Sequence, residues 1–124
     1  MAELPSKPCV ACGRVMHWRA RWARNWEAVR YCSDACRRRG VREEDLQLEA
    51  AILELLAERP LSASICPSEV ARLKAPEDWQ ALMETVRRAA RRLVHQGRIE
   101  ITQGGRVLDP SEFRGPIRLR LKRG

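Results

Sequence analysis

The amino-acid sequence predicts an α+β fold, mostly helical, in two parts. The first observation is a group of four cysteines in two close pairs within residues 9–36, which is typical of a small, separately stabilised module. The second is a series of three amphipathic helical patterns between residues 43 and 97. The third is a pair of alternating apolar and polar stretches near the C-terminus, which indicates two strands.

The cysteine spacing predicts a metal site. Cys9 and Cys12 form one pair, which Gly13 follows, and Cys32 and Cys36 form the other. Thiolates two or three residues apart can reach one tetrahedral ion without straining the backbone, and two such pairs complete a closed four-sulfur site. A glycine suits the sharp turn after the first pair. These four cysteines are therefore the predicted ligands of one structural Zn²⁺ ion.

Three other interpretations of the cysteines stay open. A disulfide requires an oxidising compartment, and nothing in the sequence indicates export. A redox CxxC is expected in a βαβ setting, which the sequence lacks. A variant metal site would use His17 in place of one cysteine, although His17 lies within a tract of tryptophans and arginines. The fifth cysteine, Cys66, is expected to be a buried or helix-capping thiol.

The positive charge is concentrated in the N-terminal third. The 124-residue chain has a net charge of +8, and residues 1–42 carry ten Lys/Arg against three Asp/Glu. A basic surface of this kind favours polyanions, most often nucleic acid, but it is also a common solvated face. The chain has no apolar run long enough to span a membrane and no signal peptide, so we expect a cytoplasmic protein without a membrane partner.

Tryptophans and arginines alternate between the two cysteine pairs. Trp18, Trp22 and Trp26 recur every four residues, so on a helix they would form one stripe. They are interleaved with three arginines, Arg19, Arg21 and Arg24. The stripe is expected either to form the core of a small metal module or to provide a stacking and phosphate-contact surface for a nucleic acid. Both can hold for different faces of the same rings.

The charge reverses sign near Gly40. Residues 37–39 are all arginine and residues 43–45 are all acidic. The acids suit the positive end of a helix that begins there. This reversal predicts a boundary between a metal-binding module at residues 1–42 and a second domain at residues 43–124.

Three helices are predicted in the second domain. The first presents leucine and isoleucine on one face and stops before Pro60. The second begins at Pro67 with Cys66 at the cap position. The third runs from Trp79 towards Gly97 and has its apolar residues at helical spacing. Its other face carries four arginines, Arg87, Arg88, Arg91 and Arg92, whose mutual repulsion must be offset by acids of the first helix or by phosphates.

Two strands complete the second domain. Residues 98–102 and 117–121 alternate in hydropathy, and a long loop between them carries Arg106 and Arg114. Two antiparallel strands joined by a partly basic loop make a wing. Three helices followed by this hairpin predict a winged helix-turn-helix domain.

The two parts resemble two bacterial families of uncharacterised function. Residues 9–37 resemble a zinc-finger-like family with a CxxCGR…W…W…YCSxxCR pattern, and YCSxxC is similar to the second knuckle of treble-clef fingers. Residues 46–121 resemble a family similar to winged helices, through the motifs ICPSEVAR, DWxALM, GRIEITQ and RGPIR. The resemblance implies a treble-clef-like zinc module followed by a winged helix, and it implies no activity.

Nucleic-acid binding is the leading functional hypothesis. Contacts are expected from the arginine-tryptophan tract, the third helix and the wing: Arg19, Arg21, Trp22, Arg24, Arg38, Arg87, Arg88, Arg91, Arg92, Arg106 and Arg114. The alternative is a protein-interaction adaptor that presents an exposed tryptophan and arginine surface to a protein partner. An enzyme or a small-molecule site is not expected, because a four-sulfur site leaves no open metal position and the sequence has no nucleophile-base pair or phosphate loop.

Overall fold

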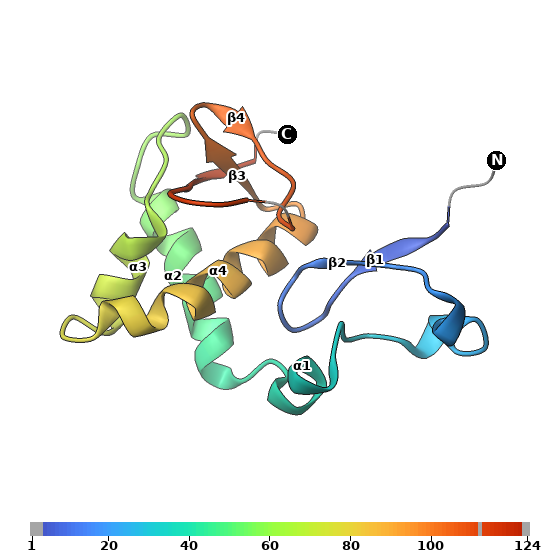
Figure 1. Ribbon diagram of the computed structural model, residues 1–124. Coiled ribbons are helices and arrows are strands. Elements are labelled where there is room, and N and C mark those ends of the chain that lie inside the picture. The colour runs from blue at the N-terminus through green and yellow to red at the C-terminus, as the bar shows by residue number, and fades with distance from the viewer. Residues whose placement is uncertain (1–3, 112, 123–124) are drawn as a thin grey trace.

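A computed structural model describes residues 4–111 and 113–122. Within these residues the protein is a small α+β fold with four α-helices and two small sheets (Figure 1). We refer to residues 4–42 as the cysteine module and to residues 43–122 as the helical domain. No helix in the described part of the chain is long and apolar enough to cross a membrane.

The cysteine module is built around a short hairpin and a short helix. Strand β1 (Ser6–Pro8) pairs antiparallel with β2 (Val15–His17), and the turn between them carries the first cysteine pair. Helix α1 (Asp34–Arg39) contains Cys36, and Cys32 lies just before its N-cap. The hydroxyl of Ser33 accepts a hydrogen bond of 3.1 Å from the backbone N–H of Cys36, as expected for a serine at the N-cap.

The tryptophan tract does not form a helix, so the three tryptophans do not form a helical stripe. Trp18 follows β2, and the next residues form two separate 3-10 turns, Ala20–Trp22 and Trp26–Ala28. Trp22 and Trp26 still meet, with ring centroids 5.6 Å apart, and both pack against the cysteines. The four-residue spacing therefore reflects packing around a small cluster, because the convergence of two cysteine pairs overrides local helical periodicity.

The three helices of the helical domain follow the prediction. They are α2 (Glu43–Ala57), α3 (Pro67–Lys74) and α4 (Trp79–His95). At the start of α3 the carboxylate of Glu69 accepts a hydrogen bond of 2.7 Å from the backbone N–H of Cys66. The apolar faces meet in one core, whose fully buried members include Ile52, Leu56, Val70, Val86 and Leu93.

The strands form a three-stranded antiparallel sheet. Strand β3 (Ile99–Gln103) lies between β4 (Arg106–Val107) and β5 (Arg118–Leu121). The expected pairing of the two longer strands is confirmed, and the short strand β4 was not predicted. The extended connector before α3 also joins this sheet, since Ile65 and Leu119 exchange two backbone hydrogen bonds of 2.8 Å.

Candidate metal centre

The structure brings the four predicted cysteines together. Their sulfur atoms all lie within 4.8 Å of one another. The Sγ atoms of Cys12 and Cys32 are 3.7 Å apart, and those of Cys32 and Cys36 are 3.5 Å apart. A tetrahedral ion with metal–sulfur bonds of about 2.3 Å places its sulfurs about 3.8 Å apart. All four cysteines are free thiols, so the cluster fits a bound metal ion and not a pair of disulfides.

The surroundings of the sulfurs affect their ionisation unequally. Cys9, Cys12 and Cys36 are buried and Cys32 is half-buried. The backbone N–H of Cys32 donates to the Sγ of Cys9 at 3.3 Å. Hydrogen bonding to Cys12 lowers the pKa of Cys9 to about 4, whereas the same bond and burial raise the pKa of Cys12. Burial also raises the pKa of Cys32. The opposite shifts of Cys9 and Cys12 indicate one shared proton in the absence of a cation, and a bound metal ion would allow both to ionise.

The two other candidate ligands lie outside this cluster. His17 is exposed at the end of β2 and is not one of the four clustered ligands. Cys66 is the N-cap residue of α3, as expected, and its sulfur accepts a hydrogen bond of 3.0 Å from Ser68. A centre with four sulfur ligands has no open coordination position. A metal ion held by all four cysteines would cross-link the turn between β1 and β2 to α1.

Helix α4 holds the first cysteine turn through three consecutive backbone carbonyls. Arg92 donates to the carbonyl of Ala11 at 2.8 Å, and Arg91 donates to that of Cys12 at 3.3 Å. The Nε2 of His95 lies 2.6 Å from the carbonyl oxygen of the next residue, Gly13. The cysteine module thus docks on α4, and Figure 1 shows the turn between β1 and β2 facing this helix.

The docking corrects two of the predicted phosphate contacts. The side chains of Arg91 and Arg92 are only 4% and 7% exposed. Besides the carbonyls, Arg91 pairs with Glu84 at 3.2 Å and Arg92 with Glu49 at 2.7 Å. Burial lowers the pKa of Arg91. These two guanidinium groups hold the protein together, so their assignment to an exposed phosphate-binding face is wrong.

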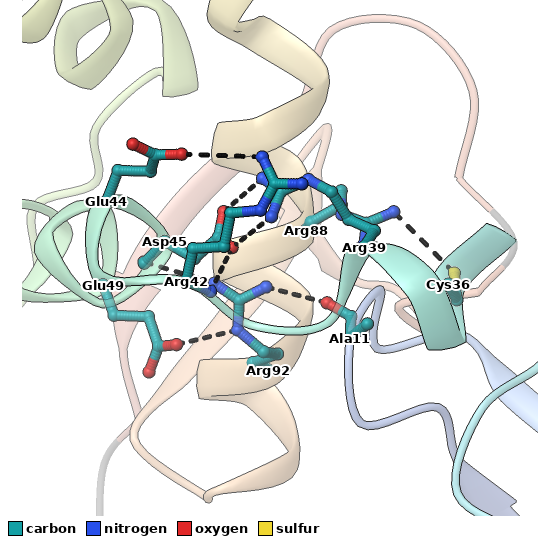
Figure 2. Close-up of polar contacts among 9 residues, drawn as sticks. All are labelled: Ala11, Cys36, Arg39, Arg42, Glu44, Asp45, Glu49, Arg88 and Arg92. Carbon is teal, nitrogen blue, oxygen red and sulfur yellow. Dashed lines mark hydrogen bonds and ion pairs between the residues drawn. The ribbon is translucent and has the colours of Figure 1, made fainter.

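The two preceding arginines of α4 are half-buried. The Nη1 of Arg88 lies 3.9 Å from the Sγ of Cys36, across the interface between the two parts of the chain (Figure 2). The Nε of Arg87 and the Nε and Nη2 of Arg88 are buried, and none has a hydrogen-bond partner among the described residues. Three of the four arginines of α4 therefore contact the cysteine module, namely Arg88, Arg91 and Arg92.

A buried ion pair joins α1 to α2. The guanidinium of Arg39 donates two hydrogen bonds of 2.7 Å to the carboxylate of Asp45 (Figure 2). That carboxylate also accepts a bond of 2.7 Å from the backbone N–H of Arg42, and its side chain is 1% exposed. Burial opposes the charge of Asp45, but the hydrogen bonds from Arg39 and Arg42 together outweigh it and lower the pKa. This ion pair therefore links the last helix of the cysteine module to the first helix of the helical domain.

The remaining predicted contacts lie on the surface. Six arginines are exposed and Trp22 is half-buried; the exposed arginines are Arg19, Arg21, Arg24, Arg38, Arg106 and Arg114. The guanidinium of Arg21 lies 4.7 Å from the ring centroid of Trp22, in a cation–π arrangement.

Beside the metal cluster a groove of about 670 Å³ opens on the cysteine module. Arg21 and Trp22 line it, together with Arg30, Tyr31 and Arg37, which the sequence analysis did not single out. All three residues lie within two positions of Cys32 or Cys36 in the sequence. This closeness to the candidate ligands is the signal by which they could have been found.

The fold and this cluster define a two-part α+β protein with a candidate metal centre at the joint. Residues 45–122 match the model of a family described as a protein of unknown function (DUF3253). Because this is more than half of the chain, the protein belongs to that family. Residues 1–39 match a second family model, described as an uncharacterized protein conserved in bacteria (DUF2256). Both resemblances expected from the sequence are confirmed, and no curated protein matches the chain.

Proposed function

We propose that the protein is a zinc-stabilised nucleic-acid-binding protein. In this proposal the cysteine module is treble-clef-like, with Zn²⁺ held by Cys9, Cys12, Cys32 and Cys36. The hairpin that carries the first cysteine pair and the short helix that begins at the second pair support this description. The three helices followed by the sheet of β3, β4 and β5 support a winged-helix description of the helical domain.

The groove beside the metal cluster is the observation that carries the proposal. It combines three arginines, Arg21, Arg30 and Arg37, with the aromatic rings of Trp22 and Tyr31. Proteins bind single-stranded nucleic acid with such sets, because the cations contact phosphates while bases stack on the rings. Arg37 also pairs with Asp34 at 2.9 Å, but both side chains are largely exposed, so this ion pair is weak and can be exchanged for a phosphate.

The proposal assigns binding to the cysteine module and not to helix α4. In winged helix-turn-helix proteins the third helix usually enters the major groove of DNA. Here Arg91, Arg92 and His95 of that helix bind carbonyls of the cysteine module. The basic residues that remain exposed on the helical domain are scattered over α3, the sheet and the loops, whereas the cysteine module carries most of the net charge.

A salt titration tests this proposal. The metal-loaded chain is titrated with single-stranded DNA, single-stranded RNA and duplex DNA at several salt concentrations. Each phosphate contact on a single strand contributes about 0.7 to the slope of log affinity against log salt, so three arginines contribute about 2. We expect the triple variant Arg21→Gln, Arg30→Gln, Arg37→Gln to lose affinity for single strands and to lower the slope by about 2.

The control variant removes three exposed arginines from the helical domain: Arg98→Gln, Arg106→Gln and Arg114→Gln. It loses the same net charge, so an equal loss of affinity in both triple variants would show that binding follows net charge and not the groove. Wild-type protein that binds none of the three nucleic acids, even at low salt, would refute the proposal and favour the protein-interaction adaptor.

The metal is tested separately. Elemental analysis of the purified chain is expected to find about one zinc per molecule. The variant Cys36→Ser removes one of the four ligands and is expected to lose the metal and to unfold the cysteine module, whereas Cys66→Ser keeps it. Full metal content in Cys36→Ser would contradict the four-sulfur assignment.

A further inference from the structure

Arg88 of helix α4 has an unusual environment. Its guanidinium reaches across the joint between the two parts of the chain, to 3.9 Å from the sulfur of Cys36 (Figure 2). Its Nε and Nη2 atoms are buried, and neither has a partner among the described residues. Burying N–H groups of a charged side chain without partners is costly. A negative charge close to the guanidinium of Arg88 is therefore required to offset this cost.

The metal centre provides that charge. Four thiolates around one divalent cation carry a net charge of −2, in a cluster that is largely buried. Sulfur ligands of a metal accept hydrogen bonds from their surroundings, and such outer partners stabilise the bound form. Uncharged thiols are weak acceptors by comparison. The contact between Arg88 and Cys36 is thus much stronger when the metal is bound than when it is absent.

Three other arginines near Arg88 bind groups other than the cysteine sulfurs. Arg39 is held by both oxygens of Asp45. Arg91 and Arg92 bind backbone carbonyls and glutamates. Among the arginines of α4, Arg88 is the one whose side chain contacts a cysteine sulfur in the part of the chain that the structure describes.

We infer that Arg88 is the counter-cation of the metal–thiolate centre, and that it couples metal binding in the cysteine module to docking of this module on helix α4. The inference requires a metal at the cysteines and is independent of nucleic-acid binding. Coupling free energies are reciprocal, so the factor by which Arg88 strengthens metal binding is also the factor by which the metal strengthens docking through Arg88.

Metal affinity of the full-length chain tests this coupling. Competition with a chelator of known affinity gives the dissociation constant for Zn²⁺ in three variants. We expect Arg88→Gln to bind Zn²⁺ about 10–100-fold more weakly than the wild type, as for the loss of an outer partner of a metal ligand. Arg88→Lys, which keeps the positive charge, should recover part of this loss.

The matched control is Arg87→Gln. Arg87 precedes Arg88 on the same helix, is also half-buried and also has an unpaired Nε, but it has no hydrogen bond to a cysteine sulfur among the described residues. We expect Arg87→Gln to bind Zn²⁺ within about twofold of the wild type, which is small beside the effect of losing an outer partner. An Arg88→Gln affinity equal to the wild type, or equal losses in both glutamine variants, would overturn the inference.

A measurement on the wild-type chain covers the case in which Arg88→Gln does not fold. Amide hydrogen exchange is compared with and without bound Zn²⁺, and we expect the metal to slow exchange along α4, outside the cysteine module. Unchanged protection of α4 would refute the coupling even if the metal binds. A wild-type chain that binds no divalent metal would overturn both this inference and the proposed zinc centre. Failure of the coupling alone is thus distinguished from failure of the zinc centre, because in the former case the metal still binds.

Discussion

Replacing Gly13 with alanine tests whether the cysteine turn is fitted to the backbone of α4. Gly13 has φ +78°, and a Cβ atom added there would lie 2.3 Å from the Cβ and 2.9 Å from the carbonyl carbon of Arg91. An alanine at positive φ costs about 1 kcal/mol. The clash adds about 1–3 kcal/mol, and we expect the upper part of this range because no side-chain rotation can move these atoms of the helix. The expected loss of unfolding free energy is therefore about 3–4 kcal/mol.

Gly97 is the matched control for that substitution. Its φ is +76°, but an added Cβ would meet nothing within 4 Å. Gly97→Ala therefore carries the backbone cost alone, about 1 kcal/mol. Urea unfolding of the metal-loaded chain, followed by tryptophan fluorescence and by far-UV circular dichroism, gives both values. If Gly13→Ala loses no more stability than Gly97→Ala, the close contact between the cysteine turn and α4 does not exist in solution.

Two further predictions concern the joint and the core. Asp45→Ala should lower the unfolding free energy by about 2–3 kcal/mol, less than for a fully buried pair because Arg39 is 27% exposed and can be hydrated. Since the folded pKa of Asp45 is lowered, its stabilising effect is complete above the unfolded value of about 3.9 and is lost as the pH falls through the lower folded pKa. The stability difference between wild type and Asp45→Ala, measured from pH 7 to pH 2, should therefore shrink only below about pH 4; a constant difference would exclude this origin. Trp79→Ala should cost about 2 kcal/mol in the same urea assay, below the usual range of about 3–5 for a buried aromatic, because the indole is half-buried and carries Arg72 at 4.3 Å from its ring centroid. A loss below about 0.5 kcal/mol would show that Trp79 is not part of the core.

Local signals predicted most of the secondary structure. Cys66 was expected at a helix start, and it is the N-cap residue of α3. The end of α4 before Gly97 and the pairing of β3 with β5 were also expected and are confirmed. These features depend on contacts between residues close in sequence, or on a periodicity that repeats along one element, so a single sequence contains them.

The tryptophan stripe and the arginines of α4 show where such signals fail. Trp18, Trp22 and Trp26 have helical spacing, but Trp18 follows strand β2, and Trp22 and Trp26 lie in two separate 3-10 turns. Arg91 and Arg92 have the spacing of an exposed basic face, yet each binds a backbone carbonyl about 80 residues earlier in the chain. A backbone carbonyl has no sequence signature, because every residue has one.

The sequence by itself determined the candidate metal ligands, because the spacing of cysteines directly encodes the geometry of a four-sulfur site. It also determined the three helices and the two longer strands of the helical domain, and the concentration of positive charge near the N-terminus. Only the tertiary structure decided that the cysteine module docks on α4, that Arg88 meets Cys36, and that the exposed basic groove lies on the other part of the chain. Docking depends on contacts between groups 50 to 80 positions apart, such as Arg88 with Cys36 and Arg92 with Ala11, and these are fixed when two folded surfaces meet and not by any local pattern.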